Sequence, residues 1–132
     1  MAKEISEERK VILEKLYHSF QIMSEDAYVY LCDMKYDYSI WSEEAVQYFG
    51  LPGEYMYQAG DIWEEHIHPD DQQSYHESIA AIFAGTDSGH DMQYRARDRM
   101  GRYVVCTCRG TVLWDADGNL DYFAGAYVTT AS

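Results

Sequence analysis

The chain has 132 residues, of which 47% are hydrophobic and 15% aromatic, including 13 tyrosines. This length and composition indicate one domain with one hydrophobic core, and they exclude a disordered or collagen-like chain. The formal net charge is −13, and the excess lies between residues 24 and 90, where fourteen acidic residues face Lys35 alone. Because such a surface repels phosphate groups, we expect no binding to nucleic acid.

The number and spacing of the cysteines and the hydropathy of the chain indicate the cellular compartment in which we expect it. Cys32, Cys106 and Cys108 are an odd number without the spacing of a disulfide framework, which favours a reducing, cytoplasmic setting. No apolar run approaches the roughly 20 residues that span a bilayer, and the charged N-terminus lacks the apolar segment of a signal peptide. We therefore expect no membrane contact by this chain, although a longer parent protein could be anchored.

An amphipathic helix is predicted over residues 6–23, because apolar residues recur there at helical spacing with charged residues between them. The stripe consists of Ile5, Ile12, Leu13, Leu16 and Phe20. Two interpretations are open: the helix packs on the sheet of its own domain, or it forms a dimer seam that continues into an upstream coiled coil. We accordingly divide the chain into a flanking or dimerising helix, residues 1–23, and a folded domain, residues 24–132.

Two strands and a short helix are expected next. Residues 27–34 and 36–41 are rich in β-forming side chains, and residues 33–37 form the turn between them. Ser42 then caps a helix that ends at Gly50. Residues 54–60 are a tyrosine-rich connector that could hold one more helical turn.

Residues 60–85 hold the elements around which the domain is organised. A short helical turn starts at Asp61, which forms a capping box with Glu64. A longer helix starts at Pro69, since proline suits a first helical turn, and Gly85 closes it. Its apolar stripe, which should lie on a sheet, consists of Tyr75, Ile79, Ile82 and Phe83.

Three strands joined by hairpins follow, over residues 92–97, 103–114 and 122–130. The second turn, residues 115–119, resembles the start of a calcium loop but lacks the required Gly and Glu further on, so we interpret it as a hairpin with Gly118 at positive φ. The element order predicts an α+β fold: a five-stranded antiparallel sheet with short helices and one longer helix on one face, flanked by the N-terminal helix.

Three motifs occur in a fixed order: HPDD at residues 68–71, YRARDRMGRY at 94–103 and WDADGNLDYFAGAYVT at 114–129. In this order they resemble the PAS domain family over residues 24–131. The resemblance is to the subgroup with a His-Pro-Asp-Asp helix start, found in bacterial sensory proteins upstream of diguanylate cyclase domains. It implies a homodimeric sensory module that binds a small ligand or partner and signals to a separate C-terminal output domain, without catalysis by this chain.

Inward-facing residues of the inner helices and the sheet could surround a small-molecule pocket. The candidates are Tyr48, Phe49, Trp63, Ile67, Ile79, Phe83, Tyr94, Val104 and Cys106. The same large side chains could instead fill the space as a solid core, because protein interiors are close-packed. We expect no cofactor, and the identity of a small ligand stays open.

Two further hypotheses belong to other classes. His66 or His76 could hold haem or a metal ion, since imidazole is a common ligand, although no complete metal site is evident. Cys106 and Cys108 share one strand face, but buried cysteines commonly behave as small hydrophobic residues. The last hypothesis is a small α+β enzyme, for which the sequence offers no phosphate loop, nucleophile elbow or acid–base pair.

Overall fold

The computed structural model describes residues 4–22, 24, 26–87 and 89–131. Its elements, in chain order, are α1 (Glu7–Ile22), β1 (Tyr28–Asp33), β2 (Tyr38–Trp41), α2 (Glu43–Phe49), β3 (Tyr55–Tyr57), α3 (Ala59–Glu64), α4 (Pro69–Phe83), β4 (Gly89–Arg97), β5 (Tyr103–Trp114) and β6 (Leu120–Ala131). The last residue of the predicted N-terminal helix, residue 23, lies outside the described residues.

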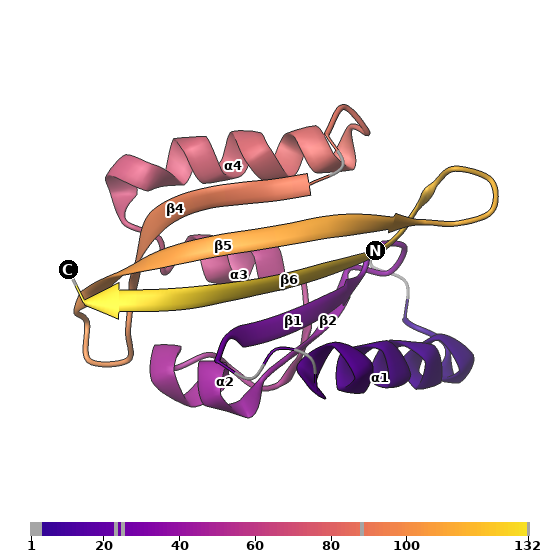
Figure 1. Cartoon of the computed structure of the whole chain (residues 1–132), viewed down its shortest axis with the longest axis horizontal. Coiled ribbons are helices and arrows are strands. Elements are labelled where there is room, and N and C mark those ends of the chain that lie inside the picture. Colours follow the sequence, from indigo (N-terminus) through magenta and orange to yellow (C-terminus); the bar gives the residue numbers. More distant parts are fainter. Residues whose placement is uncertain (1–3, 23, 25, 88, 132) are drawn as a thin grey trace.

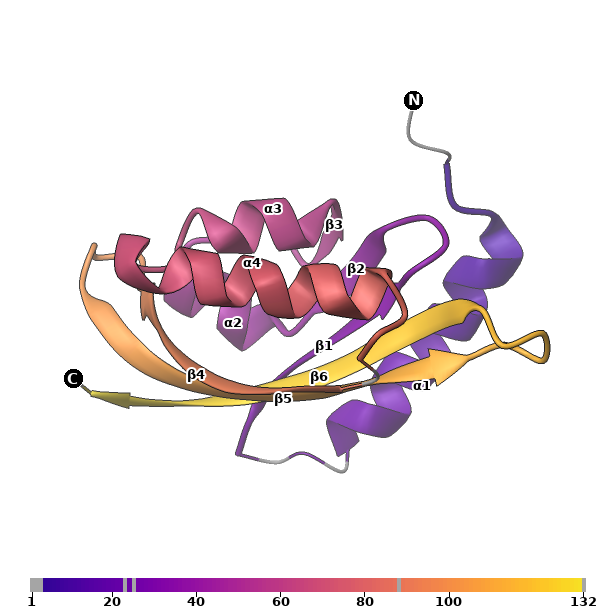
Figure 2. The ribbon, with the colours of Figure 1, turned by 90° about the horizontal axis from the view of Figure 1, so that it is seen from above.

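The strands form one sheet in the order β3-β2-β1-β6-β5-β4, with every neighbouring pair antiparallel. This confirms the predicted α+β fold. In Figure 1 the long β5–β6 hairpin crosses the molecule, with β1 and β2 on one side of it and β4 and α4 on the other. Figure 2 shows α2, α3 and α4 gathered over one side of the curved sheet, whereas α1 packs on the opposite face.

The sheet has six strands, so the predicted count of five is wrong by one. The additional strand is β3, which lies within the segment expected to be a connector. It pairs with β2 through Tyr57 opposite Tyr38 and Tyr55 opposite Ile40. A strand of three residues has no periodicity of its own, and its conformation is set by the exposed backbone groups of β2.

The helix ends follow the predicted capping residues in four places out of five, one of them Gly50, which ends α2 with φ +69°. Ser42 accepts a hydrogen bond from the Ala45 N–H at the start of α2, Pro69 occupies the first turn of α4, and Gly85 follows α4 with φ +77°. The capping box at Asp61 is wrong, because α3 begins two residues earlier, after Gln58. The Gln58 N–H donates to the Asp37 carbonyl at 2.8 Å, and this contact with the β1–β2 turn sets where α3 starts.

Strand β1 serves two cores because its side chains alternate between the faces of the sheet. Val29 and Leu31 are buried against α1, where they meet Leu13 and Tyr17. Tyr30, on the other face, packs against the side chains covered by α2, α3 and α4. Each fully buried apolar side chain of this size stabilises the fold by about 1.5–3 kcal/mol.

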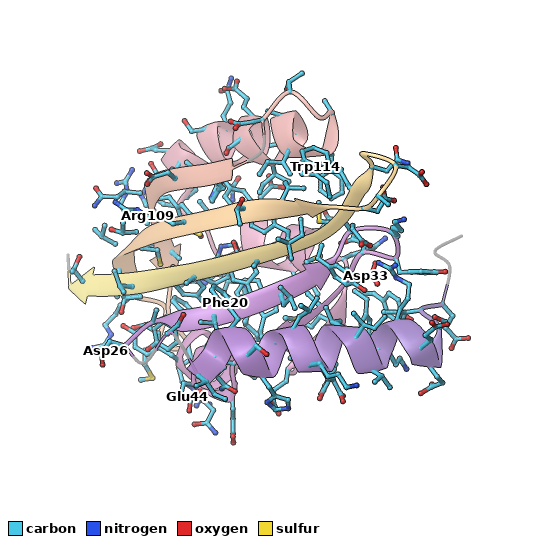
Figure 3. All side chains as sticks on the ribbon, turned by 45° about the vertical axis from the view of Figure 1, so that its right-hand side comes forward. Phe20, Asp26, Asp33, Glu44, Arg109 and Trp114 are labelled. Carbon is cyan, nitrogen blue, oxygen red and sulfur yellow. The ribbon has the colours of Figure 1, made fainter. Side chains whose placement is uncertain are left out.

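The stripe predicted as a candidate dimer seam faces the domain's own sheet. Ile5 and Leu13 are buried, and Leu16 and Phe20 pack at the edge of the same cluster. Figure 3 shows Phe20 over the sheet side of α1. Ile12 does not belong to this cluster and is 39% exposed. The packing agrees with the first of the two interpretations of this helix.

One end of α1 is fixed by charge. The Arg9 guanidinium donates to Asp33 at 2.6 Å and to Asp121 at 2.7 Å, and it lies 4.8 Å from the centre of the Tyr122 ring. The Asp33 carboxylate is fully buried and also accepts the backbone N–H groups of the following turn. Arg9 therefore connects α1 with the β1–β2 turn and the β5–β6 hairpin, near the position of Asp33 in Figure 3.

The core on the opposite face is built from aromatic side chains. One glycine, Gly125, allows one of these rings to lie close to the sheet. Tyr127 is buried at its centre and contacts Tyr28, Trp41 and Trp63. Tyr30 lies directly over Gly125, so that a Cβ at this position would collide with the Tyr30 ring. A side chain larger than hydrogen at residue 125 would have to displace that ring.

The turn between β5 and β6 is a hairpin, as predicted from its incomplete calcium-loop motif. Asp115 accepts the backbone N–H groups of Asp117 and Asn119, each at 2.9 Å. Gly118 has φ +81°. The carboxylate that resembles a first calcium ligand is therefore used to close the turn.

Candidate functional site

A cavity of about 70 Å³ lies between the sheet and the helices α3 and α4. Its aromatic walls are Tyr30, Trp41, Trp63, Tyr75, Phe83 and Phe123. The remaining lining residues are Cys32, Met34, Asp37, Ser39, Ala59, Gly60, Ile79 and Ile82. The volume exceeds that of one water molecule, about 30 Å³, and is far below the ~300 Å³ at which drug-sized ligand pockets begin.

The walls follow from sequence patterns on two elements. Helix α4 contributes its apolar stripe of Tyr75, Ile79, Ile82 and Phe83. Strand β1 contributes Tyr30 and Cys32, which alternate with the residues that face α1. The cavity is therefore the place where the α4 stripe and the inward face of β1 do not fully meet.

Most polar groups around the cavity are hydrogen-bonded. Trp41 Nε1–H donates to the Ser39 hydroxyl at 3.2 Å, and the Cys32 thiol donates to the Asp33 carbonyl at 3.7 Å. The Tyr30 hydroxyl lies 3.5 Å from Cys108 Sγ. These contacts hold the side chains in place.

The phenol and thiol groups of the cavity are poor nucleophiles. Burial raises the pKa of Tyr30, of Tyr75 and of the Cys32 thiol well above their ordinary values. All three groups are consequently protonated near neutral pH, and a thiolate or phenolate is what nucleophilic catalysis requires.

Asp37 is the charged residue among those that line the cavity. It lies in the β1–β2 turn with φ 52°, and its carbonyl accepts the Gln58 N–H. Burial and the nearby charge of Asp61 raise the pKa of its carboxyl above the ordinary value. Within residues 4–22, 24, 26–87 and 89–131, no side chain or backbone N–H bonds to this carboxylate.

The structure divides the nine predicted pocket residues into two groups. Trp63, Ile79 and Phe83 line the cavity. The other six, which belong to or pack against the filled core on the same face, are Tyr48, Phe49, Ile67, Tyr94, Val104 and Cys106. Sequence reasoning missed Tyr30, Cys32 and Asp37, although the alternation along β1 contains the signal for the first two.

The two histidines considered as haem or metal ligands lie away from the cavity. Both ring nitrogens of His66 are 3.1 Å from carbonyl oxygens, those of Ile62 and Phe49. His76 is on the solvent side of α4, where Nδ1 lies 3.1 Å from a Glu64 carboxylate oxygen. Among the described residues, no group of three or more His, Cys, Asp or Glu side chains is arranged to hold a metal ion.

The two cysteines of β5 are structural. Cys106 and Cys108 are buried on the inner face of the sheet, as their shared strand face predicts. Burial raises the pKa of the Cys106 thiol to about 12 and also raises that of Cys108.

Across the described part of the chain, no helix is long and apolar enough to cross a membrane.

Comparisons with known proteins agree with this architecture. A family described as "PAS fold" matches residues 38–127, while a search of curated proteins found no match. A sensory box histidine kinase/response regulator from Burkholderia thailandensis superposes with a TM-score of 0.65 at 20% identity, covering 86% of this chain and 84% of that chain. The N-terminal domain of a diguanylate cyclase with a PAS/PAC sensor from Marinobacter aquaeolei gives 0.66 at 20% identity, covering 78% and 94%.

A eukaryotic structure is also similar. The PAS-B domain of Drosophila melanogaster Cycle, in a structure described with bound ethylene glycol, has a TM-score of 0.55 at 13% identity and covers 78% of this chain and 99% of that one. At these identities the superpositions demonstrate a shared fold.

Proposed function

The chain belongs to the PAS fold family, and on this premise we propose that it is a sensory module of a signalling protein. A small molecule binds in the cavity between the sheet, α3 and α4, and the resulting shift passes to a separate output domain. The observation that carries the proposal is the cavity itself, whose walls combine aromatic surface with a few fixed polar groups. The ethylene glycol described with the similar Cycle domain supports a ligand of that small size.

The route of the signal is proposed from strands that touch both the cavity and the outer elements. Tyr30 and Phe123 line the cavity from β1 and β6, which are paired along the whole of β1. Leu31, the next residue of β1, is buried beneath α1. A ligand that binds one arrangement of these strands more tightly than another shifts α1 and β6 together.

Native mass spectrometry of the purified chain tests the ligand. We expect a retained small molecule, and we expect Ile79→Phe, which places a ring in the cavity, to lose it without a change in circular dichroism. Ile22→Phe on the exposed side of α1 is the matched control and should retain it. Wild-type protein that carries no additional mass, and whose thermal midpoint no compound of a small-metabolite set raises, contradicts the proposal.

We propose that the module is a homodimer that associates through the solvent side of α1. The apolar residues available there are Val11, Ile12 and Ile22, since Leu13 is occupied by the domain's own sheet. In sedimentation equilibrium the double variant Val11→Glu/Ile22→Glu should be monomeric, and Gln21→Glu, which adds charge at another exposed position, should remain dimeric. A monomeric wild-type protein at high micromolar concentration contradicts this part.

For the output we propose a diguanylate cyclase domain in a cytoplasmic signalling protein. The His-Pro-Asp-Asp subgroup and the similarity to the Marinobacter sensor domain support this choice. A chimera with this chain upstream of a diguanylate cyclase domain should change its cyclase rate when the molecule identified by mass spectrometry is added. The same chimera with Ile79→Phe should not respond, and a wild-type chimera without a response contradicts the choice of output.

A further inference from the structure

The cavity combines aromatic rings with an unpaired negative charge. Tyr30 stacks on Trp41 with ring centres 4.7 Å apart, and Trp41 meets Trp63 at 5.3 Å. The faces of such rings carry partial negative charge and attract cations within about 6 Å, although the faces by which Tyr30 and Trp41 stack already cover each other. Asp37 adds a carboxylate to the same lining.

Asp37 is partly buried and belongs to the lining of the cavity. It shares the lining with Cys32, and its charge contributes to the raised pKa of the Cys32 thiol. Asp61 on α3 acts on the pKa of Asp37, and Tyr75 on α4 shares the cavity lining; neither supplies positive charge. An ionised Asp37 thus lies in a partly desolvated place beside a second acid.

The basic side chains nearest to Asp37 in the sequence or on the sheet form ion pairs with other carboxylates. Lys35, the single Lys or Arg between positions 24 and 90, pairs with Asp115 at 2.7 Å. Arg9 lies beyond the sheet and pairs with Asp33 and Asp121. Among the described residues, no basic side chain therefore forms an ion pair with Asp37.

We propose that the cavity binds a small organic cation of the alkylammonium class, with its methyl groups against the rings of Tyr30, Trp41 and Trp63 and its charge opposite Asp37. The inference rests on the proposed function and specifies its ligand. A neutral molecule of equal size would fill the same space but would leave the carboxylate partly desolvated and unpaired, which is unfavourable. Alkylammonium ions suit aromatic walls because they are large, weakly hydrated and attracted by ring faces.

Isothermal titration with two probes of similar size and different charge tests the proposal. Tetramethylammonium chloride should bind, and tert-butanol, its neutral counterpart, should bind at least about tenfold more weakly. In Asp37→Asn the affinity for tetramethylammonium should fall by about tenfold or more, because the variant keeps the side-chain size and removes the charge. Glu8→Gln, which removes one charge from the exposed side of α1, is the matched control and should leave the affinity unchanged.

Two further measurements separate recognition from folding. Phe83→Leu removes a half-exposed ring from the cavity and should weaken tetramethylammonium binding severalfold while the thermal midpoint stays close to that of the wild type. The wild-type affinity should fall as the pH is lowered through the titration of Asp37, and the affinity of Asp37→Asn should not.

The outcomes distinguish this inference from the function on which it rests. Equal affinity for tert-butanol and tetramethylammonium, or no effect of Asp37→Asn, overturns the cation while leaving a ligand-binding cavity. Binding of neither probe also overturns it, and the retained mass of the native protein then decides the sensory proposal independently.

Discussion

Two aspartates of the same β1–β2 connection have opposite environments. Asp33 points toward α1, is fully buried, and is satisfied by Arg9 and by two backbone N–H groups. Asp37 lines the cavity and has no such partner among the described residues. The buried carboxylate on the α1 face of the sheet is thus paired with a cation, whereas the carboxylate that lines the cavity on the opposite face has no cationic partner in the part of the chain that the structure describes. Both faces hold buried cores, and the cavity proposed for ligand binding lies on the second face.

The largest expected effect on this contrast is on the α1 face. Leu13→Ala should lower the free energy of unfolding by about 3 kcal/mol, because Leu13 is fully buried and its neighbours on the sheet can close the space only partly. Urea denaturation measures the change. Ile12→Ala, one residue away and partly exposed, should cost well under half as much, and equal losses for the two variants would mean that α1 is not docked as described.

The next effect concerns the paired aspartate. Arg9→Met should lower the free energy of unfolding by about 2–3 kcal/mol, because it leaves the buried Asp33 carboxylate without its cation. Lys10→Met removes the neighbouring exposed pair with Glu7 and should cost less than about 1 kcal/mol. A loss for Arg9→Met no larger than that for Lys10→Met would show that Asp33 does not depend on Arg9.

The unpaired aspartate should give a smaller effect of opposite sign. The pKa of Asp37 is raised in the folded protein, so its contribution to stability is present below the ordinary carboxyl pKa and is lost as the pH rises through the folded value. Asp37→Asn should therefore gain stability relative to the wild type between acid and neutral pH. Thermal denaturation over that range measures the difference, and a variant less stable than the wild type at neutral pH would place Asp37 among the residues that hold the fold.

The sequence predicts the features of this fold that depend on residues close together in the chain, and it does not predict those that depend on distant contacts. Helix ends at Ser42, Pro69 and Gly85 are recognisable because capping chemistry is local. Strand β3 is not, since three residues follow the pairing offered by β2. The predicted start at Asp61 fails for a related reason: a contact between Gln58 and Asp37, distant in sequence, overrides a local preference.

The candidate site is predictable only in part. Periodicity correctly turns Ile79 and Trp63 inward, and both line the cavity. It equally turns Phe49 inward, where the ring is packed in the filled core, because the direction of a side chain does not reveal whether its neighbours fill the space. Asp37 carries no motif, and its significance follows from burial and from the absence of a bonded partner within the described residues, which are properties of the folded chain.

The contact between Gly125 and Tyr30 has a consequence for ligand size. The ring of Tyr30 forms part of the cavity wall on one side and rests on the backbone of β6 on the other. A single added methyl at residue 125 would displace the Tyr30 ring and so change the shape of the cavity, although no side chain of the lining would be replaced. The absence of a side chain at Gly125 therefore helps to determine the size of ligand that the cavity can bind.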